Sequence, residues 1–451
     1  MSKEKLSAHK TIQTAMQDHG AHRHLLVLAV IFVLSLIAYW PTFSNGFQME
    51  WDDQWMVFNP MTQTPFSWQF VLHVLKTPFN GQWAPLNQLL YTFLFNMFGF
   101  NATAFHIASF LFHLCNIVLV YVLLRRVLLD CTSLNPNRLE WMSAISTLLF
   151  AIHPLQVESV AWISASKFPL FAFFYLLAAW VFVRYLKKGG ILRYLLTCVL
   201  FVLAYMCKEH ALSFPLLVTL LSVCYRKDYR KGSFWLMIGP LYVLALLMGM
   251  HELFYVAGYD DYVSHGSYAW WQRVVFCFYS ISTYFFKWIV PTRLSYLYNF
   301  PVPVGEPLPM AMIFYPVLLC ILVFSLWERI KANRVVLACI VFFLIHLVFV
   351  LHIFVLPRAA IIADRYMYLP IIGLNVIFAY LVTSPKLVRR YRKVVTATVV
   401  AVVLVLTGLS HVRTGAWVDS DTLKREWMKV NGLEKNESIS YMYNNQNLSR
   451  Q

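Results

Sequence analysis

Two adjacent carboxylates, Asp52 and Asp53, follow closely on the first long apolar run of the chain. Their neighbours in the stretch 48–55 (QMEWDDQW) are aromatic or polar, with no cation among them. At a membrane surface, an ionised carboxylate can take a proton from an incoming hydroxyl group while a second reactant stays anchored in lipid. We interpret the pair as a candidate catalytic base. It could also hold a divalent metal ion, and no other cofactor is indicated.

Further ionisable residues interrupt apolar stretches downstream, where such side chains are costly and commonly mark a site. Arginine suits a phosphate group because its planar fork contacts two oxygens at once. Glu158 lies in an apolar hairpin and requires a cationic partner, such as Lys167, Lys208 or an arginine. The candidates are His106, His153, Glu158, Lys167, Lys208, Glu209, Arg358 and Arg365.

Each candidate also has a simpler interpretation. Lys208 and Glu209 can neutralise each other within a short turn. Arg358 and Arg365 can anchor the chain at the membrane interface. His106 can pack between helices.

The composition places these residues in an integral membrane protein. Hydrophobic residues make up 59% of the 451, and only 13% are charged, about half the share of a soluble domain. No P-loop, GxGxxG or HExxH motif is present, which argues against ATP-driven pumping and most soluble chemistry.

Eleven apolar runs predict membrane-spanning helices of about 20 residues each. A cytoplasmic N-terminus places most lysines and arginines on the inner side, as the positive-inside rule requires. This asymmetry accounts for the net charge of +16 without a nucleic-acid partner. The runs lie near 24–43, 104–124, 142–164, 168–184, 191–206, 210–224, 234–250, 310–327, 335–355, 366–383 and 394–411.

The predicted fold is therefore an all-α integral membrane bundle of about eleven helices. We expect a cytoplasmic segment 1–23, a multi-pass domain 24–411 and a polar tail 412–451 on the outer side. The first outer loop, 44–103, carries a single Lys or Arg and is expected to contain short helices.

The order of several motifs resembles the membrane portion of the transmembrane and tetratricopeptide-repeat O-mannosyltransferases and their bacterial relatives, which have the GT-C fold. The His-Pro…Glu-Ser-Val-Ala and Asp-Arg-Tyr…Leu-Pro stretches are the most specific. The matching segments are Trp51–Asp53, Trp83–Leu86, Phe105–His106 with His113, Leu149–Ala161, Cys207–Glu209, Pro291–Ser295 and Ala363–Pro370.

This resemblance implies a glycosyltransferase that uses a polyprenyl-phosphate sugar, mannose-like in the family, on the face away from the cytoplasm. By position, Asp52 or Asp53 is the base. Lys208, Arg358 and Arg365 are candidates for the donor phosphate. The residues expected to shape the pocket are His106, His153, Glu158, Lys167 and Glu209.

The chain departs from the family in three places. Ser164–Phe168 stands where relatives have an arginine-rich turn, so Lys167 is expected to replace the arginine. Asp364 stands where relatives have a glutamate. The polar, Asn-rich segment 412–451 has no room for a repeat array, which needs several 34-residue copies. The chain therefore resembles a bacterial-type relative without repeats, and the acceptor stays open between a protein Ser/Thr and a glycan or lipid.

The expected reaction is a one-step displacement with inversion, in the bacterial inner membrane or the endoplasmic reticulum membrane. The alternative from another class is a multi-pass transporter or flippase of a lipid-linked or anionic solute, for which cations in a membrane cavity serve equally well. A third possibility is an inactive scaffold, against which the retained aspartate pair argues.

Overall fold

The computed structural model describes residues 22–225, 227–256, 268–353 and 360–433. Within these ranges the chain is helical, and extended pairing is limited to two isolated bridges, Phe79 with Gln82 and Tyr298 with Ile362. Neither bridge belongs to a strand. The expectation of an all-α protein is confirmed for the described part of the chain.

Among the described residues, six helices are long and apolar enough to cross a membrane, and a bent pair would add a seventh. The protein is therefore a multi-pass helical membrane protein. The pair, α6 and η2–α7, bends by 53° where Pro154 follows His153. The six helices are His22–Ser44, Ala102–Cys131 (α5), Ile163–Lys188 (η3 and α8), Gly232–Phe254 (α11), Met310–Ala332 (η6 and α14) and Pro385–Trp417 (α17 and η8).

Shorter apolar helices complete the bundle, and together all these helices overlap the eleven apolar runs of the sequence. The bent pair comprises Pro136–Ile152 (α6) and Pro154–Ala161 (η2 and α7). The four shorter helices are Ile191–Tyr205 (α9), Glu209–Cys224 (η4 and α10), Arg334–Leu347 (α15) and Ile371–Val382 (α16).

Several helices begin where local chemistry favours a start. Asn101 caps α5 by accepting a hydrogen bond from Ala104 N–H, and Asn333 caps α15 in the same way. Such side chains satisfy backbone donors that have no partner in the first turn. Proline occupies the first position of α6 and α17, where its missing N–H costs nothing.

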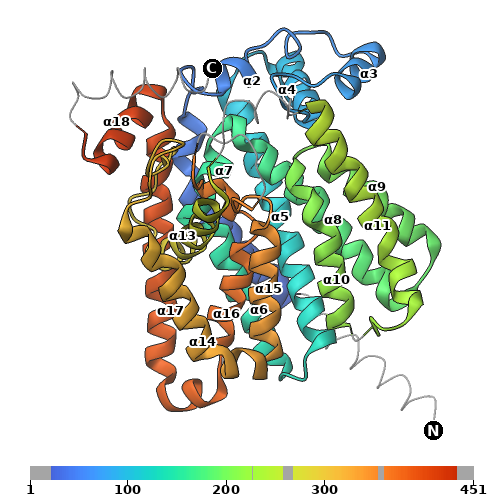
Figure 1. Cartoon of the computed structure of the whole chain (residues 1–451), viewed down its shortest axis with the longest axis vertical. Helices are drawn as coiled ribbons and strands as arrows, with labels where there is room; N and C mark the ends of the chain where they lie inside the picture. Colours follow the sequence, from blue (N-terminus) through green and yellow to red (C-terminus); the bar gives the residue numbers. More distant parts are fainter. Residues whose placement is uncertain (1–21, 226, 257–267, 354–359, 434–451) are drawn as a thin grey trace.

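Helices α2, α3 and α4 gather at one end of the bundle, which we call the α2 end (Figure 1). They belong to the predicted outer loop 44–103, and α2 begins directly at the aspartate pair. The remaining helices of the described residues are Asp53–Met56 (α2), Trp68–Lys76 (α3), Pro85–Phe98 (α4), Trp270–Ile289 (α13), Asp364–Met367 (η7) and Ser420–Asn431 (α18). Helix α11 continues into a π-helical turn, Glu252–Val256.

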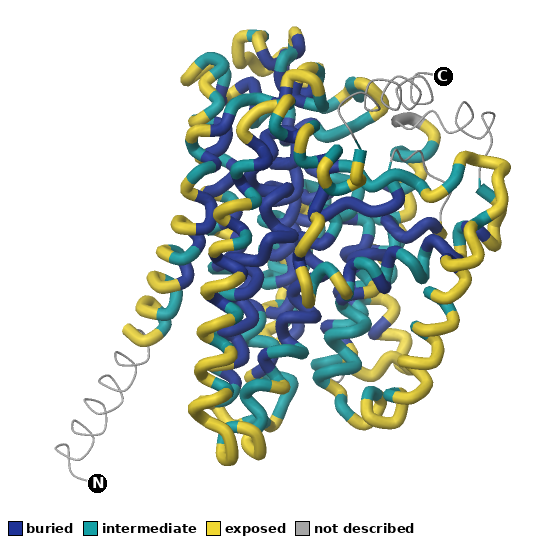
Figure 2. Tube along the Cα trace, turned by 90° about the vertical axis from the view of Figure 1, so that its left-hand side faces the viewer, coloured by how far each residue is buried: buried dark blue, intermediate teal, exposed yellow. Residues whose placement is uncertain are grey.

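The buried core runs along the middle of the bundle and widens beneath the α2 end (Figure 2). Helix α8 lies at its centre and contacts α5, α9 and α10. Lipid tails are as apolar as leucine, so close packing and polar links between helices hold such a bundle together. Gly373 illustrates the packing, because a Cβ there would lie 2.5 Å from the carbonyl oxygen of Cys339 on α15.

Polar side chains tie distant helices together within this core. Asn116 on α5 donates to the carbonyl of Pro169 on α8 at 2.8 Å, and His113 contacts the hydroxyl of Tyr368 at 2.8 Å. Ser410 on α17 donates to Ile152 O at 2.6 Å. These bonds satisfy buried polar groups where no water competes.

The segment after α17 packs back onto the outer loop, rather than leaving it as a free polar tail from residue 412. Trp417 is fully buried and Trp427 is 3% exposed. Gln48 donates to Trp417 O at 2.8 Å, and Lys424 forms an ion pair with Glu50. Residues 412–433 therefore pack as part of the folded protein, because Trp417 and Trp427 are buried and the segment bonds to the outer loop.

Candidate active site beside helix α2

The two adjacent aspartates have different surroundings. Asp53 is fully buried, and its carboxylate accepts three hydrogen bonds: from Gln48 N–H at 2.8 Å, from Ser164 N–H at 3.0 Å, and from the Ser164 hydroxyl. Burial raises the pKa of Asp53 to about 6, although these hydrogen bonds act in the opposite direction. The Asp53 carboxylate therefore joins α2 to η3 (Ile163–Ser166).

Asp52 precedes α2 at its N-cap position but makes no capping hydrogen bond, and its side chain is half-buried. It lies within electrostatic range of Lys167 and Arg365. A carboxylate within electrostatic range of two cations that keeps access to solvent can accept a proton from a ligand. Asp52 therefore has the freedom that Asp53 lacks.

Lys167 begins α8 directly beneath the outer loop and is 7% exposed. Its ammonium group donates to Gln82 Oε1 at 2.8 Å and contacts Met56 Sδ at 3.7 Å. Both partners are uncharged. A buried cation is costly unless an anion compensates it. This arrangement favours an anionic ligand beside Lys167.

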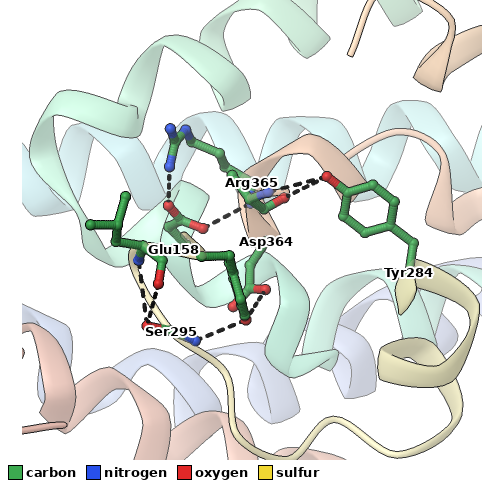
Figure 3. A network of polar contacts seen from close by, with 8 residues as sticks. Glu158, Tyr284, Ser295, Asp364 and Arg365 are labelled. Atoms are coloured by element: carbon green, nitrogen blue, oxygen red, sulfur yellow. Dashed lines mark hydrogen bonds and ion pairs between the residues drawn. The ribbon is translucent and has the colours of Figure 1, made fainter. Parts of the chain in front are cut away.

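Glu158 and Arg365 form an ion pair between α7 and η7 (Figure 3). The backbone N–H of Arg365 also donates to the second oxygen of Glu158, at 2.9 Å. The guanidinium carbon lies 5.4 Å from the centre of the Trp162 ring and 5.2 Å from that of Tyr366. Arg365 is thus the partner that the sequence required for Glu158.

A second network, which the sequence did not indicate, supports the helix that carries Arg365 (Figure 3). The Tyr298 hydroxyl donates to Asp364 Oδ1 at 2.7 Å and accepts a hydrogen bond from Ser295 N–H at 2.8 Å. The Tyr284 hydroxyl exchanges hydrogen bonds with the backbone of Ala363. No local pattern links Tyr298 to Asp364, because 66 positions separate them.

Lys208 and Glu209 form the close pair that the simpler interpretation predicted. Lys208 Nζ lies 2.6 Å and 2.8 Å from the two carboxylate oxygens of Glu209. His210 Nδ1 lies 3.2 Å from the same carboxylate. The ammonium group also lies 5.5 Å from the centre of the Phe168 ring. The pair remains within electrostatic range of Lys167, at the edge of the site.

The histidines among the predicted residues have packing contacts instead. His153 Nδ1 accepts Leu155 N–H at 3.2 Å, and its other ring nitrogen lies 3.0 Å from Trp288 O. These hydrogen bonds give His153 a structural role at the bend between α6 and η2. His106 is buried on α5 against the backbone of Asn45 and Gly46. Arg358 lies outside the described residues.

The charged residues that converge at the α2 end are thus Asp52, Glu158, Lys167, Lys208, Glu209 and Arg365. They come from five separate parts of the chain. Among the described residues, no group of three His, Cys, Asp or Glu side chains is arranged to hold a metal ion. The arrangement combines an accessible carboxylate outside any ion pair of the described residues, Asp52, with several cations, which suits an anionic ligand and a proton transfer.

Comparisons with protein-family models, with curated proteins and with solved structures find no match for this chain.

Proposed function

We propose that the protein is a membrane-embedded glycosyltransferase that uses a polyprenyl-phosphate sugar, and that the apolar helices of its described residues form a GT-C-like bundle. The observation that carries this proposal is the position of Asp52, a half-buried carboxylate within electrostatic range of Lys167 and Arg365. A base beside cations at the edge of an apolar bundle can serve a donor that is anionic at one end and lipid at the other. The α2 end is then the non-cytoplasmic face.

Asp52 acts as the base, and Asp53 positions it. Asp53 already accepts three hydrogen bonds and is fully buried, so it has no room for an acceptor hydroxyl. Asp52 has no such commitments in its capping position. The Asp53–Ser164 contact fixes the start of α2 and thereby the place of its neighbour.

Lys167 is the foremost ligand for the donor phosphate. Lys208 and Arg365 each have a carboxylate partner, Glu209 and Glu158 respectively, whereas both contacts of Lys167 are uncharged. Asp52 and Glu209 act on Lys167 electrostatically without forming an ion pair with it, and a phosphate would place a negative charge in direct contact with it. Arg365 has a side-chain exposure of 20% and can contribute a second contact without leaving Glu158.

The reaction is a single displacement at the anomeric carbon. The acceptor oxygen forms a bond to that carbon as Asp52 takes its proton, and the bond from the carbon to the phosphate oxygen breaks. The electron pair leaves with the polyprenyl monophosphate, a stable anion that needs cations rather than a strong acid. Attack opposite the leaving group inverts the configuration.

The test is donor consumption in proteoliposomes with radiolabelled polyprenyl-phosphate mannose and its glucose and galactose counterparts, with neutral oligosaccharides and Ser/Thr-rich peptides supplied as acceptors. We expect wild type to consume one of them, and Asp52→Asn to reduce the rate by about a hundredfold or more while still binding the donor. Asp421→Asn, an exposed carboxylate on α18, is the matched control. Consumption of none of the donors, or full activity of Asp52→Asn, would overturn the proposal.

A further inference from the structure

Two adjoining hollows lie in the segment that carries α2, α3 and α4. Their walls share Met61 and Phe79. The larger hollow has a volume of about 610 Å³ and lies along α3, whereas the smaller, of about 40 Å³, lies between α2 and α4. We call the two together the loop groove. Trp55 lines its smaller part, three positions after Asp52.

The loop groove lacks formal charge. Among the described residues that line it, none is Asp, Glu, Lys or Arg, and His73 is the single ionisable side chain apart from tyrosine. Charged ligands are held by charged or strongly polar partners. The occupant of this groove is therefore uncharged.

Two side-chain amides, of Gln82 and Asn87, line the smaller hollow and carry hydrogen-bond donors. The ammonium group of Lys167 can only donate hydrogen bonds. Gln82 therefore accepts from it through Oε1, which leaves the Gln82 Nε2 group as a donor. Asn87 likewise accepts from Ser166 through Oδ1, and its Nδ2 has no hydrogen-bond partner among the described residues although the side chain is 1% exposed. An unpaired buried donor is costly, and a ligand oxygen would relieve it.

The same hollow has flat apolar walls. The rings of Trp55 and Phe79 lie 6.5 Å apart at an angle of 34°. A saccharide matches this combination with its ring in the larger hollow, which Phe79 also lines, and one oxygen reaching the amides of the smaller one. Its ring has apolar C–H faces, while its hydroxyl, ring and bridging oxygens all accept hydrogen bonds. A peptide fits less well, since half of its backbone polar groups are themselves donors.

We propose that the loop groove binds a neutral saccharide. As an acceptor site this rests on the proposed function, because the groove begins three residues after Asp52. It narrows the acceptor from the open set of proteins, glycans and lipids to an uncharged glycan, whose hydroxyl at the smaller hollow would face the base.

The test measures binding to the full chain in nanodiscs, without donor, by ligand-observed NMR. The probes are mannose, glucose and galactose oligosaccharides, oligosaccharides that contain uronic acids, and uncharged Ser/Thr-rich peptides. We expect neutral oligosaccharides to bind. Trp55→Ala and Phe79→Ala should each weaken the binding by about tenfold. The matched control is Trp68→Ala, since Trp68 is 69% exposed on α3 and does not line the groove.

Binding of the peptides or the acidic probes in preference to the neutral oligosaccharides would overturn the inference. Binding of none of the probes would overturn it too, as would equal affinity for wild type and both groove variants. Using two variants keeps the test decisive if one of them fails to fold. The donor-consumption assay is separate: donor turnover without saccharide binding refutes the groove alone, and saccharide binding without donor turnover refutes the transferase alone.

Discussion

Asp53 joins two parts of the chain that lie 111 positions apart, because its carboxylate accepts both the backbone N–H and the hydroxyl of Ser164. This contact anchors the first outer loop to the turn that precedes α8. It also separates the roles of two neighbouring aspartates that look equivalent in the sequence. One of them is committed to structure, and the other remains accessible.

Asn substitutions of the two aspartates should therefore affect different properties: Asp53→Asn the stability of the fold, and Asp52→Asn the activity. Asp53→Asn places an amide N–H against donors of Gln48 or Ser164, and we expect it to cost about 1–3 kcal/mol of stability. Asp52→Asn should leave stability within about 0.5 kcal/mol and lower the rate of donor consumption by about a hundredfold or more. Thermal unfolding in detergent, with the donor assay, measures both. A stable Asp53→Asn would show that the buried bonds to Ser164 contribute little.

Stability should depend on pH through Asp53. Burial raises its pKa from 3.8 to about 6 in the folded protein, so the folded state keeps a proton at pH values where the unfolded chain has lost it. The contribution of Asp53 is then greatest below about pH 4, falls as the pH rises to about 6, and stays low above that. The unfolding temperature measured between pH 4 and 7.5 should show this fall in wild type but not in Asp53→Asn. Equal slopes would contradict it.

Removing the charge of Lys167 should weaken donor binding without lowering the stability of the fold. Lys167→Met deletes a buried cation that has no carboxylate contact, so we expect the unfolding temperature to stay equal or rise. The KM for the donor should rise by about tenfold or more because one phosphate contact is lost. Lys188→Met, an exposed position at the far end of α8, should change neither quantity. An unchanged KM in Lys167→Met would remove Lys167 from the donor site.

The Glu158–Arg365 pair offers a double-mutant cycle. Glu158→Gln leaves the Arg365 guanidinium without its charged partner in a largely buried place, and a loss of about 3 kcal/mol is expected. Adding Arg365→Met to Glu158→Gln should restore part of that loss. Chemical unfolding of the two single variants and the double variant gives the coupling free energy. A coupling near zero would mean that the contact does not stabilise η7 against α7.

Local features of the sequence predicted the helical architecture well. The apolar runs near 104–124 and 394–411 correspond to α5 and α17, because hydropathy over a window of about 20 residues decides whether a segment can span lipid. The aspartate pair is also a local prediction, since two carboxylates in an aromatic loop after a span are visible without any fold. The presence of a cationic partner for Glu158 followed from the cost of a buried charge.

Contacts between distant segments could not be obtained in the same way. The partner of Glu158 is Arg365, 207 positions later, and the anchors of Asp53 and Asp364 are Ser164 and Tyr298. Trp417 and Trp427 look like part of a polar tail by composition, yet both are buried. Hydropathy and helix starts depend on neighbouring residues, whereas these contacts depend on how helices pack against one another. Only the packed bundle distinguishes the accessible Asp52 from the buried Asp53.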